Sequence, residues 1–344
     1  MRAAILREYR QPLVIEDVPE PECPPDGVVL RVAACGVCRS DWHGWVGEHP
    51  RVKPGQIGGH EYCGEVVEAG PDATFRVGDR VIAPFILSCG ACPECRSGHQ
   101  TTCLDQRLPG FAEPGAFAQY VAVPRDHNLA HLPEQVSPAL AAGLGCRVTT
   151  AWHALTGRAA LAGGEWLAVH GTGGVGLSAA LLGRALGARV VVVDVVREKL
   201  DHALGLGIDA AVLAGEDTAY QIREITGGGA HVSVEALGIP ATVNASLGCL
   251  RPRGRHVQIG MPVGHTARME VDMSAVYQGN LALYGTRGMP SWRYPSLLAL
   301  ITSGAVDMSP LVAREVRLQD VSAELAAFDG PTPPGVAVVT DFAG

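Results

Sequence analysis

The chain has 344 residues, of which 47% are hydrophobic, 18% charged and 5% aromatic. This is the composition of a folded globular protein, and the length predicts two domains that each bury a core of their own. The formal net charge of -8 and the lack of a Lys/Arg cluster exclude a protein that binds nucleic acid through a basic face. No run of about 18 apolar residues occurs, so no membrane-spanning segment is expected.

The N-terminal sequence MRAAILREYRQPLVIEDV does not predict a signal peptide. Charges at Arg7, Glu8 and Arg10 interrupt the apolar core that such a peptide needs, so we expect a cytoplasmic protein. Four of the ten cysteines lie between residues 89 and 103. In a chain without an export signal, this clustering favours metal or redox chemistry over disulfides.

The pattern along the chain falls into three zones. Residues 1–147 contain short β patterns separated by Gly and Pro, with strands expected at VVLRVAACG, GEVVEAG and GDRVIAPF. Residues 148–285 alternate the strands WLAVHG, RVVVVDV, HVSVEALG and GRHVQIG with helices through GLSAALLGRALGA and REKLDHALGLG. After about residue 285 a Pro-rich mixed pattern returns, and DGPTPPG (329–335) is expected to be a surface loop.

The strand–helix alternation in the middle zone predicts a parallel sheet with helices on both faces. The simplest arrangement is an α/β protein in which a doubly wound domain, residues 148–285, is inserted into a mostly β domain. That second domain would combine residues 1–147 and 286–344 and carry a cysteine-rich lobe at about residues 86–106.

A glycine-rich turn, GTGGVG, follows the strand WLAVH and precedes a helix. Gly171, Gly173 and Gly176 match the pattern GxGxxG, with Gly174 and Val175 between them. The first glycine allows a tight turn, the second lets the backbone approach a pyrophosphate, and the third lets helix and strand pack closely. The N-terminus of the helix offers N–H groups to the phosphates. For the motif alone, an ordinary strand–helix turn is the alternative.

Asp194 ends the next strand, eighteen residues after Gly176. A carboxylate at this place can accept both ribose hydroxyls of an adenosine, although it could also cap the following helix. Each like-charge pair with a 2′-phosphate would cost about 4 kcal/mol at ~4 Å, so NAD is preferred over NADP. Arg197 could accommodate a 2′-phosphate, but its place on the helix also fits exposure to solvent.

Cys89, Cys92, Cys95 and Cys103 form a C-x2-C-x2-C-x7-C run. Four thiolates at this spacing can wrap one tetrahedral zinc ion, and because sulfur would fill every position this zinc would be structural. An iron–sulfur cluster and free or disulfide-bonded cysteines are the alternatives. A zinc ribbon that grips nucleic acid conflicts with the acidic charge balance.

A second group of candidate ligands is spread over three segments. CGVCRSDWH contains Cys38, GGHEYCGE contains His60 and LGCRVTT contains Cys146. A catalytic zinc takes three protein ligands and keeps one position open, which two thiolates and an imidazole would satisfy. Each residue could instead be an ordinary buried side chain, and Cys35 with Cys38 could form a CxxC redox pair.

Taken together, GVCRSDWH, GGHEYCGEVVEAG, CGACPEC, LGC and GTGGVG resemble the zinc-dependent medium-chain alcohol dehydrogenases. The motifs occur in the expected order over essentially the whole chain. The resemblance implies a GroES-like, mostly β catalytic domain with an inserted Rossmann domain, two zinc ions per chain and NAD as cofactor. It also implies that Cys38, His60 and Cys146 are the ligands of the catalytic zinc.

The same resemblance implies roles for the neighbouring residues. Glu61 is a carboxylate that can approach the metal during ligand exchange, and Asp41 orients His60 through its other ring nitrogen. Ser40 and His43 form a proton relay. The expected cofactor contacts are, besides the glycine turn and Asp194, Arg39, Thr150, Lys199, Ile259, Met261 and Arg287. Many family members carry an arginine near the C-terminal strand, whereas GVAVVTDF (335–342) has none, and Arg287 could compensate.

The expected activity follows from the same motifs. Polyol dehydrogenases of the superfamily commonly have a glutamate where this chain has Cys146, so we expect an NAD-dependent enzyme that interconverts a primary or secondary alcohol with its aldehyde or ketone. Formaldehyde, polyol and threonine dehydrogenases are alternatives, and a nucleotide- or zinc-binding protein without turnover is a further one. Candidate pocket-wall residues are Phe85, Trp42, Trp45 and Leu108. The resemblance also implies a tetramer or dimer whose sheets join edge to edge through residues 270–288.

Overall fold

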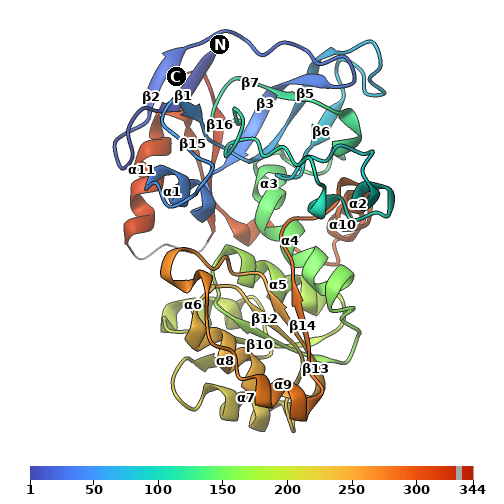
Figure 1. Ribbon diagram of the computed structural model, residues 1–344, viewed down its shortest axis with the longest axis vertical. Helices are drawn as coiled ribbons and strands as arrows, with labels where there is room; N and C mark the ends of the chain where they lie inside the picture. The colour runs from blue at the N-terminus through green and yellow to red at the C-terminus, as the bar shows by residue number, and fades with distance from the viewer. Residues whose placement is uncertain (331–334, 344) are drawn as a thin grey trace. The chain divides into compact units, whose positions relative to one another are not determined.

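The computed structural model describes residues 1–330 and 335–343, and the chain divides into two compact units (Figure 1). The first unit comprises Met1–Thr149, Gly288–Gly304 and Ser309–Gly344, and the second comprises Thr150–Arg287 with Ala305–Met308. The sequence did not predict that 305–308 belongs to the second unit, because so short a segment carries no periodic pattern. Most of the loop expected at 329–335 lies outside the described residues.

The first unit is built around a mainly antiparallel sheet of order β15-β16-β3-β5-β6-β8, with β7 paired to β3 as well. Its central strands are β3 (Val28–Gly36) and β5 (Glu61–Ala69), whose register places Gly36 opposite Glu61. Valine and alanine dominate β3 and are largely buried, as suits a strand inside a core. The remaining strands of this sheet are β6 (Arg80–Ile82), β7 (Tyr120–Val123), β8 (Ala130–His131), β15 (Val312–Arg317) and β16 (Val336–Asp341).

A smaller antiparallel sheet and short helices complete the first unit. The sheet has the order β2-β1-β4, and one helix, α3, is capped by Ser137, whose hydroxyl accepts from the Leu140 N–H. A π-helical turn, Leu144–Val148, follows α3 and is entirely buried; such turns occur often at functional sites. The elements are β1 (Arg2–Leu6), β2 (Val14–Asp17), β4 (Gln56–Ile57), α1 (Arg39–Trp45), α2 (Pro93–Arg96), α3 (Pro138–Gly143), α10 (Tyr294–Thr302) and α11 (Val321–Ala326).

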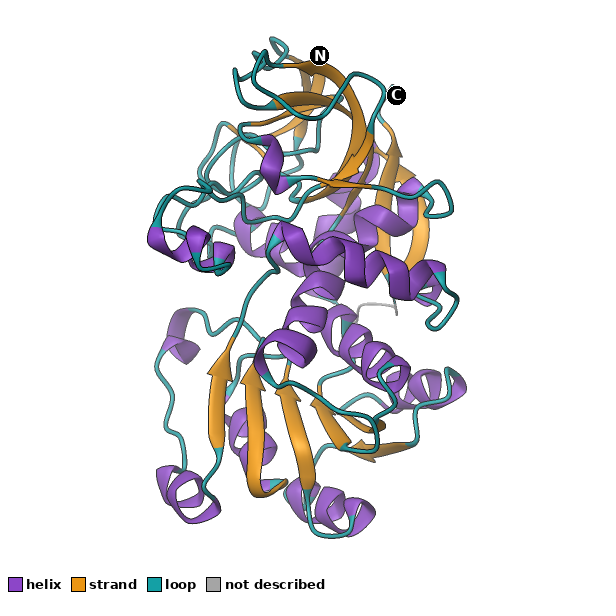
Figure 2. Ribbon diagram, turned by 90° about the vertical axis from the view of Figure 1, so that its right-hand side faces the viewer, coloured by secondary structure: helices purple, strands orange, loops and turns teal. Residues whose placement is uncertain are grey.

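The second unit is a parallel sheet of order β11-β10-β9-β12-β13-β14 with helices packed against it (Figure 2). The order reverses at β9, which is the doubly wound arrangement, and the predicted fold class is confirmed. The strands are β9 (Trp166–His170), β10 (Arg189–Asp194), β11 (Ala210–Leu213), β12 (Ala230–Glu235), β13 (Leu250–Gln258) and β14 (Ala282–Gly285). The helices are α4 (Thr149–Trp152), α5 (Gly174–Ala185), α6 (Arg197–Gly205), α7 (Thr218–Thr226), α8 (Pro240–Gly248) and α9 (Met273–Gly279).

The central strands of this sheet are continuous apolar runs because helices cover both of their faces. Val190, Val191 and Val192 on β10 are fully buried, and the whole of β9 is buried. Each valine removed from water contributes about 1.5–3 kcal/mol. Within the described residues, no helix is both long and apolar enough to cross a membrane.

A buried carboxylate fixes the loops at the carboxyl ends of β12 and β13. Glu235 accepts hydrogen bonds from the N–H groups of Leu237 at 2.9 Å and Gly238 at 2.8 Å and from the Thr242 hydroxyl at 2.6 Å. The Gln258 amide also donates to it. A Cβ at Gly260 would lie 2.6 Å from this carboxylate, so the loop after β13 requires glycine at that position.

Candidate active site

Four buried side chains from distant parts of the first unit meet at one point. Cys38, His60, Glu61 and Cys146 each offer one ligand atom, and these atoms all lie within 4.8 Å of one another. Cys38 is the residue before α1, His60 and Glu61 stand at the start of β5, and Cys146 lies in the π-helical turn. The three segments that carry the candidate zinc ligands therefore converge in the fold.

His60 has one ring nitrogen engaged and the other unpartnered. Its Nδ1 lies 2.8 Å from Asp41 Oδ1, and the Asp41 carboxylate also accepts from the backbone N–H of Cys38 at 2.9 Å. Its Nε2 is buried without a hydrogen-bond partner among the described residues, a situation that costs about 1–3 kcal/mol. A carboxylate at Nδ1 leaves the lone pair on Nε2, which is the form of histidine that binds a metal. The donor set therefore fits a zinc ion.

The two thiols of this site are not equivalent. A hydrogen bond from Cys146 holds the pKa of Cys38 well below its ordinary value, and nearby His60 and Arg147 act in the same direction against the effect of burial. The environment thus stabilises negative charge on sulfur, and a thiolate is the form that ligates zinc.

A buried ion pair holds Glu61 beside the ligands. Arg147 Nη2 lies 3.0 Å from Glu61 Oε2, and Arg147 Nε lies 3.3 Å from Oε1. Burial raises the pKa of Glu61 to about 7, against the lowering effect of Arg147. Arg147 was not predicted from the sequence as a residue of this site. An arginine directly after a candidate ligand in an apolar segment is the signal that could have found it, because a buried guanidinium needs a carboxylate partner.

Helix α1 carries the residues expected to move a proton and to contact phosphates. Ser40 and His43 are three residues apart and so lie on one face of the helix. His43 Nδ1 lies 2.8 Å from Glu48 Oε2. The Arg39 guanidinium lies over the rings of Trp42 and Phe328, at 4.9 and 5.0 Å from their centroids, and donates to the Phe328 carbonyl at 2.9 Å.

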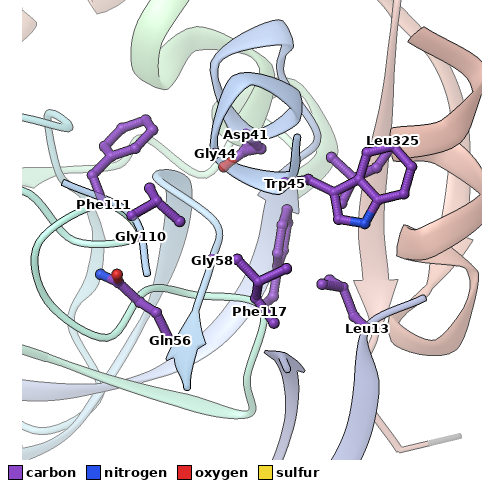
Figure 3. A pocket seen from close by; sticks show the side chains of 12 residues that line it. Leu13, Asp41, Gly44, Trp45, Gln56, Gly58, Gly110, Phe111, Phe117 and Leu325 are labelled. Carbon is purple, nitrogen blue, oxygen red and sulfur yellow. The ribbon is translucent and has the colours of Figure 1, made fainter. Parts of the chain in front are cut away.

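The candidate pocket-wall residues fall in different places. Phe85 meets the His60 ring edge-on, with centroids 5.8 Å apart, and Leu108 is buried. Trp42 packs against Arg39, and its Nε1 donates to Asp329 at 2.9 Å. Trp45 lines a mainly apolar pocket that has Asp41 in its wall (Figure 3).

Two aromatic rings near His60 were also not predicted from the sequence. Phe111 packs on the His60 ring with centroids 4.5 Å apart, and His49 stacks on Phe111. Phe111 also lines the pocket drawn in Figure 3. Neither residue lies in a recognised motif, so only the folded chain relates them to His60.

The four-cysteine loop forms the other ligand cluster. The Sγ atoms of Cys89, Cys92, Cys95 and Cys103 lie within 4.8 Å of one another, and all four cysteines are free of disulfides. Gly90, with a φ of +72°, bends the loop, and a Cβ there would lie 2.8 Å from the His127 ring. The set is compact enough for one tetrahedral ion.

Backbone N–H groups point at the sulfurs of this loop. The N–H of Cys89 donates to Cys103 Sγ at 3.2 Å, and the N–H of Cys92 donates to Cys89 Sγ at 3.3 Å. The N–H groups of Leu104 and Cys95 lower the pKa of Cys92 to about 6. Amide donors aimed at sulfur favour thiolates, so this cluster also fits a bound cation.

In the second unit, the glycine turn has the shape that a dinucleotide needs. Gly171 has a φ of +92°, and a Cβ on Gly176 would lie 1.8 Å from the Gly171 carbonyl oxygen. A Cβ on Gly173 would meet no atom within 4 Å, so the backbone is open there to a ligand. Helix α5 begins at this turn and directs its unpaired N–H groups toward the same place.

Asp194, at the end of β10, is tied to the glycine turn. Its Oδ2 accepts from the N–H of Thr172 at 2.8 Å and from the Thr172 hydroxyl at 2.7 Å, and its Oδ1 accepts from the Val196 N–H at 3.1 Å. Helix α6 begins after Val196, so Asp194 is not its N-cap. Both oxygens keep lone pairs for further donors.

The other predicted cofactor contacts lie at various depths in the second unit. Ile259 is fixed by its N–H, which donates to the Glu235 carbonyl at 2.9 Å. A Cβ at Gly238 would lie 2.5 Å from the Met261 carbonyl oxygen, so these two loops touch. Thr150 is buried, Val175, Lys199 and Ile259 are half-buried, and Met261 and Arg287 are exposed. Arg197, which was considered only as a residue that could accommodate a 2′-phosphate, is also exposed.

Comparison with known proteins agrees with this arrangement. Residues 24–134 match the family model described as "Alcohol dehydrogenase GroES-like domain", and residues 174–303 match "Zinc-binding dehydrogenase". An alcohol dehydrogenase of Geobacillus stearothermophilus is 36% identical over 266 residues, which cover 76% of this chain and 78% of the relative. An L-threonine 3-dehydrogenase of Streptomyces avermitilis is 29% identical over 98% of this chain and 99% of its own.

A solved alcohol dehydrogenase of Thermus sp. ATN1 superimposes with a TM-score of 0.92 at 28% identity, covering 99% of this chain and 100% of its own. Fold, ligand clusters and relatives together define an oxidoreductase of the zinc-binding dehydrogenase type. The chain belongs to the zinc-dependent medium-chain alcohol dehydrogenase family.

Proposed function

We propose that the protein is an NAD-dependent enzyme that holds two zinc ions and interconverts a primary or secondary alcohol with its aldehyde or ketone. The observation that carries this proposal is the buried, unpartnered Nε2 of His60 among two thiols. Such a set leaves room for one exchangeable ligand on zinc. When bound, zinc lowers the pKa of a hydroxyl ligand and NAD accepts the hydride.

Cys38, His60 and Cys146 would hold the catalytic ion. Asp41 keeps the His60 ring in one tautomer and one orientation through the 2.8 Å contact at Nδ1. Arg147 draws the Glu61 carboxylate to one side by two hydrogen bonds, which leaves Glu61 adjacent to the ligands but not required as one of them. We assign Glu61 the role of assisting ligand exchange.

A proton leaves the substrate hydroxyl during oxidation, and α1 supplies the groups to remove it. Ser40 Oγ would accept this proton, and His43 would release it to solvent. The Glu48 carboxylate at 2.8 Å from His43 Nδ1 stabilises the charge that the imidazole gains on protonation. A relay of this kind lets the proton leave a site from which water is excluded.

The cofactor would bind to the second unit through the turn at Gly171, Gly173 and Gly176. Asp194 favours NAD because a 2′-phosphate would bring negative charge to a carboxylate that is held in place by Thr172. Arg39, held by the Trp42 and Phe328 rings, supports a role in contacting the diphosphate. Thr150, Lys199, Ile259, Met261 and Arg287 complete the proposed set of contacts.

The four-cysteine loop would bind the second zinc ion for stability. Its sulfurs leave no position for substrate, and its backbone donors favour thiolates over thiols. Arg125 joins the loop to the rest of the unit by donating to the Cys89 carbonyl at 2.9 Å.

Metal content and initial rates test the proposal together. Zinc-loaded protein should contain two zinc ions per chain and should form NADH from a graded series of primary and secondary alcohols, with a higher kcat/KM for NAD than for NADP. His60→Ala should contain one zinc ion and show no turnover, whereas His131→Ala, at an exposed histidine of β8, should behave as wild type. Failure of the zinc-loaded protein to oxidise any alcohol or reduce any aldehyde with either cofactor would sink the proposal.

The full-length match to a threonine dehydrogenase supports a second substrate class. L-Threonine is a secondary alcohol, so the chemistry at the metal would be the same and only the recognition of the remaining polar groups would differ. L-Threonine and sorbitol therefore belong in the substrate series, and the ratio of their kcat/KM values to those of simple alcohols separates the alternatives.

Location and assembly are further parts of the proposal. Zinc-binding thiolates need a reducing compartment, and the ten cysteines are free, which supports a cytoplasmic location. Strand β14 forms an edge of the parallel sheet, with Leu283 exposed on it, which supports a dimer joined through this edge or a tetramer built from such dimers. Light scattering after size-exclusion chromatography measures the assembly directly.

A further inference from the structure

A histidine that has no role in the proposed chemistry lies beside the candidate active site. The His49 ring stacks on Phe111 with centroids 4.5 Å apart and an angle of 22° between the planes. Phe111 in turn packs against the candidate zinc ligand His60, again with centroids 4.5 Å apart. One aromatic ring, Phe111, thus separates His49 from a candidate ligand of the metal.

The backbone holds His49 firmly. Its N–H donates to the His43 carbonyl at 3.0 Å, and the neighbouring Glu48 N–H donates to the same carbonyl at 2.9 Å. The His49 carbonyl accepts from the Val52 N–H at 3.2 Å. The segment after α1 is thus tied to the last turn of the helix, and the imidazole has a defined place.

The imidazole has a hydrogen-bond donor to offer. The backbone N–H of Arg51 donates to His49 Nδ1 at 3.4 Å, which places the ring proton of the neutral form on Nε2. Among the described residues, no acceptor pairs with this Nε2. Partial burial lowers the pKa of His49 to about 4, so the ring is neutral near pH 7.

The ring N–H groups of two tryptophans on α1 already donate hydrogen bonds within the protein. Trp42 Nε1 donates to Asp329 at 2.9 Å, and Trp45 Nε1 donates to the Gln11 carbonyl at 2.7 Å. Phe85 and Phe111, the rings in contact with His60, carry no polar atom. Among Trp42, Trp45, Phe85, Phe111 and His49, His49 is therefore the one whose ring donor has no acceptor in the described part of the chain.

We propose that His49 is a specificity-determining residue whose Nε2 N–H donates a hydrogen bond to a second oxygen on the alcohol substrate. The inference rests on the proposed function and deepens it. It names as preferred substrates the alcohols that carry a further hydroxyl, carbonyl or carboxylate oxygen. A site that hydrogen-bonds a substrate oxygen discriminates strongly against the analogue that lacks it, because the donor is then left unpaired.

A matched series of six-carbon substrates tests this assignment on the zinc-loaded enzyme with NAD. The series contains 1-hexanol, the linear hexanediols and 6-hydroxyhexanoate, which differ in the presence and position of a second oxygen. In the wild type, at least one oxygenated member should exceed 1-hexanol in kcat/KM by tenfold or more. His49→Leu should remove this preference by raising the KM of the oxygenated substrate, so that its kcat/KM falls toward that of 1-hexanol.

Two further variants separate hydrogen bonding from packing. His49→Gln keeps an N–H donor and should retain part of the preference. His131→Leu removes a histidine that packs on Phe75, at 4.6 Å between centroids, and should leave the preference unchanged.

Three results would overturn the assignment. These are a wild type without preference for any oxygenated substrate, a His49→Leu variant that loses equal activity on all substrates, and a His49→Gln variant that behaves as His49→Leu. A wild type that oxidises 1-hexanol but fails these tests leaves the proposed function intact. A zinc-loaded wild type that is inactive on the whole series, and on the corresponding aldehydes with NADH or NADPH, refutes the proposed function and the assignment together.

Discussion

The two compact units treat their buried polar side chains in opposite ways. In the first unit, Cys38, His60 and Cys146 direct ligand atoms to one point, and the His60 Nε2 has no partner in the described part of the chain. In the second unit, His170 is equally buried, and its Nδ1 also has no partner in the described part of the chain. Near His170, however, a single thiol is in hydrogen-bonding contact, that of Cys249 at 3.6 Å from Nε2, in the described part of the chain. An unpartnered buried nitrogen indicates a metal site where other ligand atoms converge on it, and a neutral buried group where it stands alone.

The same contrast applies to carboxylates. Asp41 is bound to a candidate metal ligand and transmits its charge to that ligand. Glu235 instead collects donors from its own loop, including the N–H groups of Leu237 and Gly238. The first carboxylate holds the ring of a candidate ligand, and the second holds only groups of its own and neighbouring loops. Substitutions at the two ligand clusters of the first unit are therefore expected to reduce metal binding, activity or stability, whereas a substitution in the second unit is expected to change only stability.

The largest effect is expected from Cys38→Ala. Loss of a thiolate ligand should lower kcat/KM for alcohol oxidation by more than about 1000-fold, because metal polarisation of the substrate supplies several kcal/mol. Bound zinc should fall from two ions per chain to one, and the circular dichroism spectrum should stay unchanged. Cys63→Ala, which removes a buried thiol bound to the Pro138 carbonyl, is the matched control and should keep both ions. Turnover in a Cys38→Ala preparation that lacks the second ion would contradict the ligand role.

The second prediction concerns the four-cysteine loop. Cys92→Ser should destabilise the protein by on the order of 3 kcal/mol, measured as a lower Tm and a lower urea midpoint, because the metal links this loop to folding. The kcat of the molecules that remain folded should be unchanged. Cys23→Ser, at a half-buried cysteine outside both clusters, should have the Tm of the wild type. An unchanged Tm for Cys92→Ser would show that this loop holds no structural metal.

The third prediction addresses the carboxylate behind His60. Asp41→Asn keeps the shape of the side chain but removes the charge, and should reduce zinc affinity or activity by about 10- to 100-fold. Competition with a coloured chelator measures the affinity. Asp126→Asn, at another buried carboxylate that bonds Thr74, should leave zinc affinity unchanged. Equal affinities for the Asp41 variant and the wild type would remove Asp41 from the metal site.

The smallest effect is expected in the second unit. Burial lowers the pKa of His170 to about 3, against 6.5 for the exposed side chain, so the unfolded chain binds a proton in the interval between these values and the folded chain does not. Above pH 6.5 the ring is neutral in both states, so protonation does not reduce the free energy of unfolding. As the pH falls from 6.5 toward 3, protonation of the ring in the unfolded chain lowers the free energy of unfolding. From pH 6 to pH 5, wild-type stability should therefore fall by about 1.4 kcal/mol more than that of His170→Leu. Urea unfolding at several pH values measures both slopes, and identical slopes would show that His170 does not stay neutral.

The fold could be predicted from the sequence because the motifs that indicate it are each contained in one segment of the chain. The glycine turn at Gly171, the valine run of β10 and the cysteine spacing each lie within one segment, and family resemblance related the segments to one another. The convergence of His60 with Cys38 and Cys146 could be named only through that resemblance, because no local pattern encodes a distance between remote residues. Residues 305–308 have no hydrophobic periodicity that would predict an element, and only the structure shows that they belong to the second unit.

Two features escaped sequence reasoning for a physical reason. The Arg147–Glu61 pair depends on burial, since on a surface the same two side chains would be solvated separately. The His49–Phe111–His60 stack depends on three segments meeting in space, and rings attract one another without a fixed spacing in the chain. Side chains that act through tertiary packing become visible only when the packing is known.

The π-helical turn at Leu144–Val148 has a consequence for how this chain can vary. Its extra residue places Cys146 and Arg147 side by side with different partners, one at the ligand cluster and the other on Glu61. Shortening the turn by a single residue would restore regular α-helical winding and rotate the preceding side chains by about 100° relative to those that follow. A substitution in this stretch changes one side chain at a time, whereas deletion of one residue would displace a candidate metal ligand and break an ion pair in a single event.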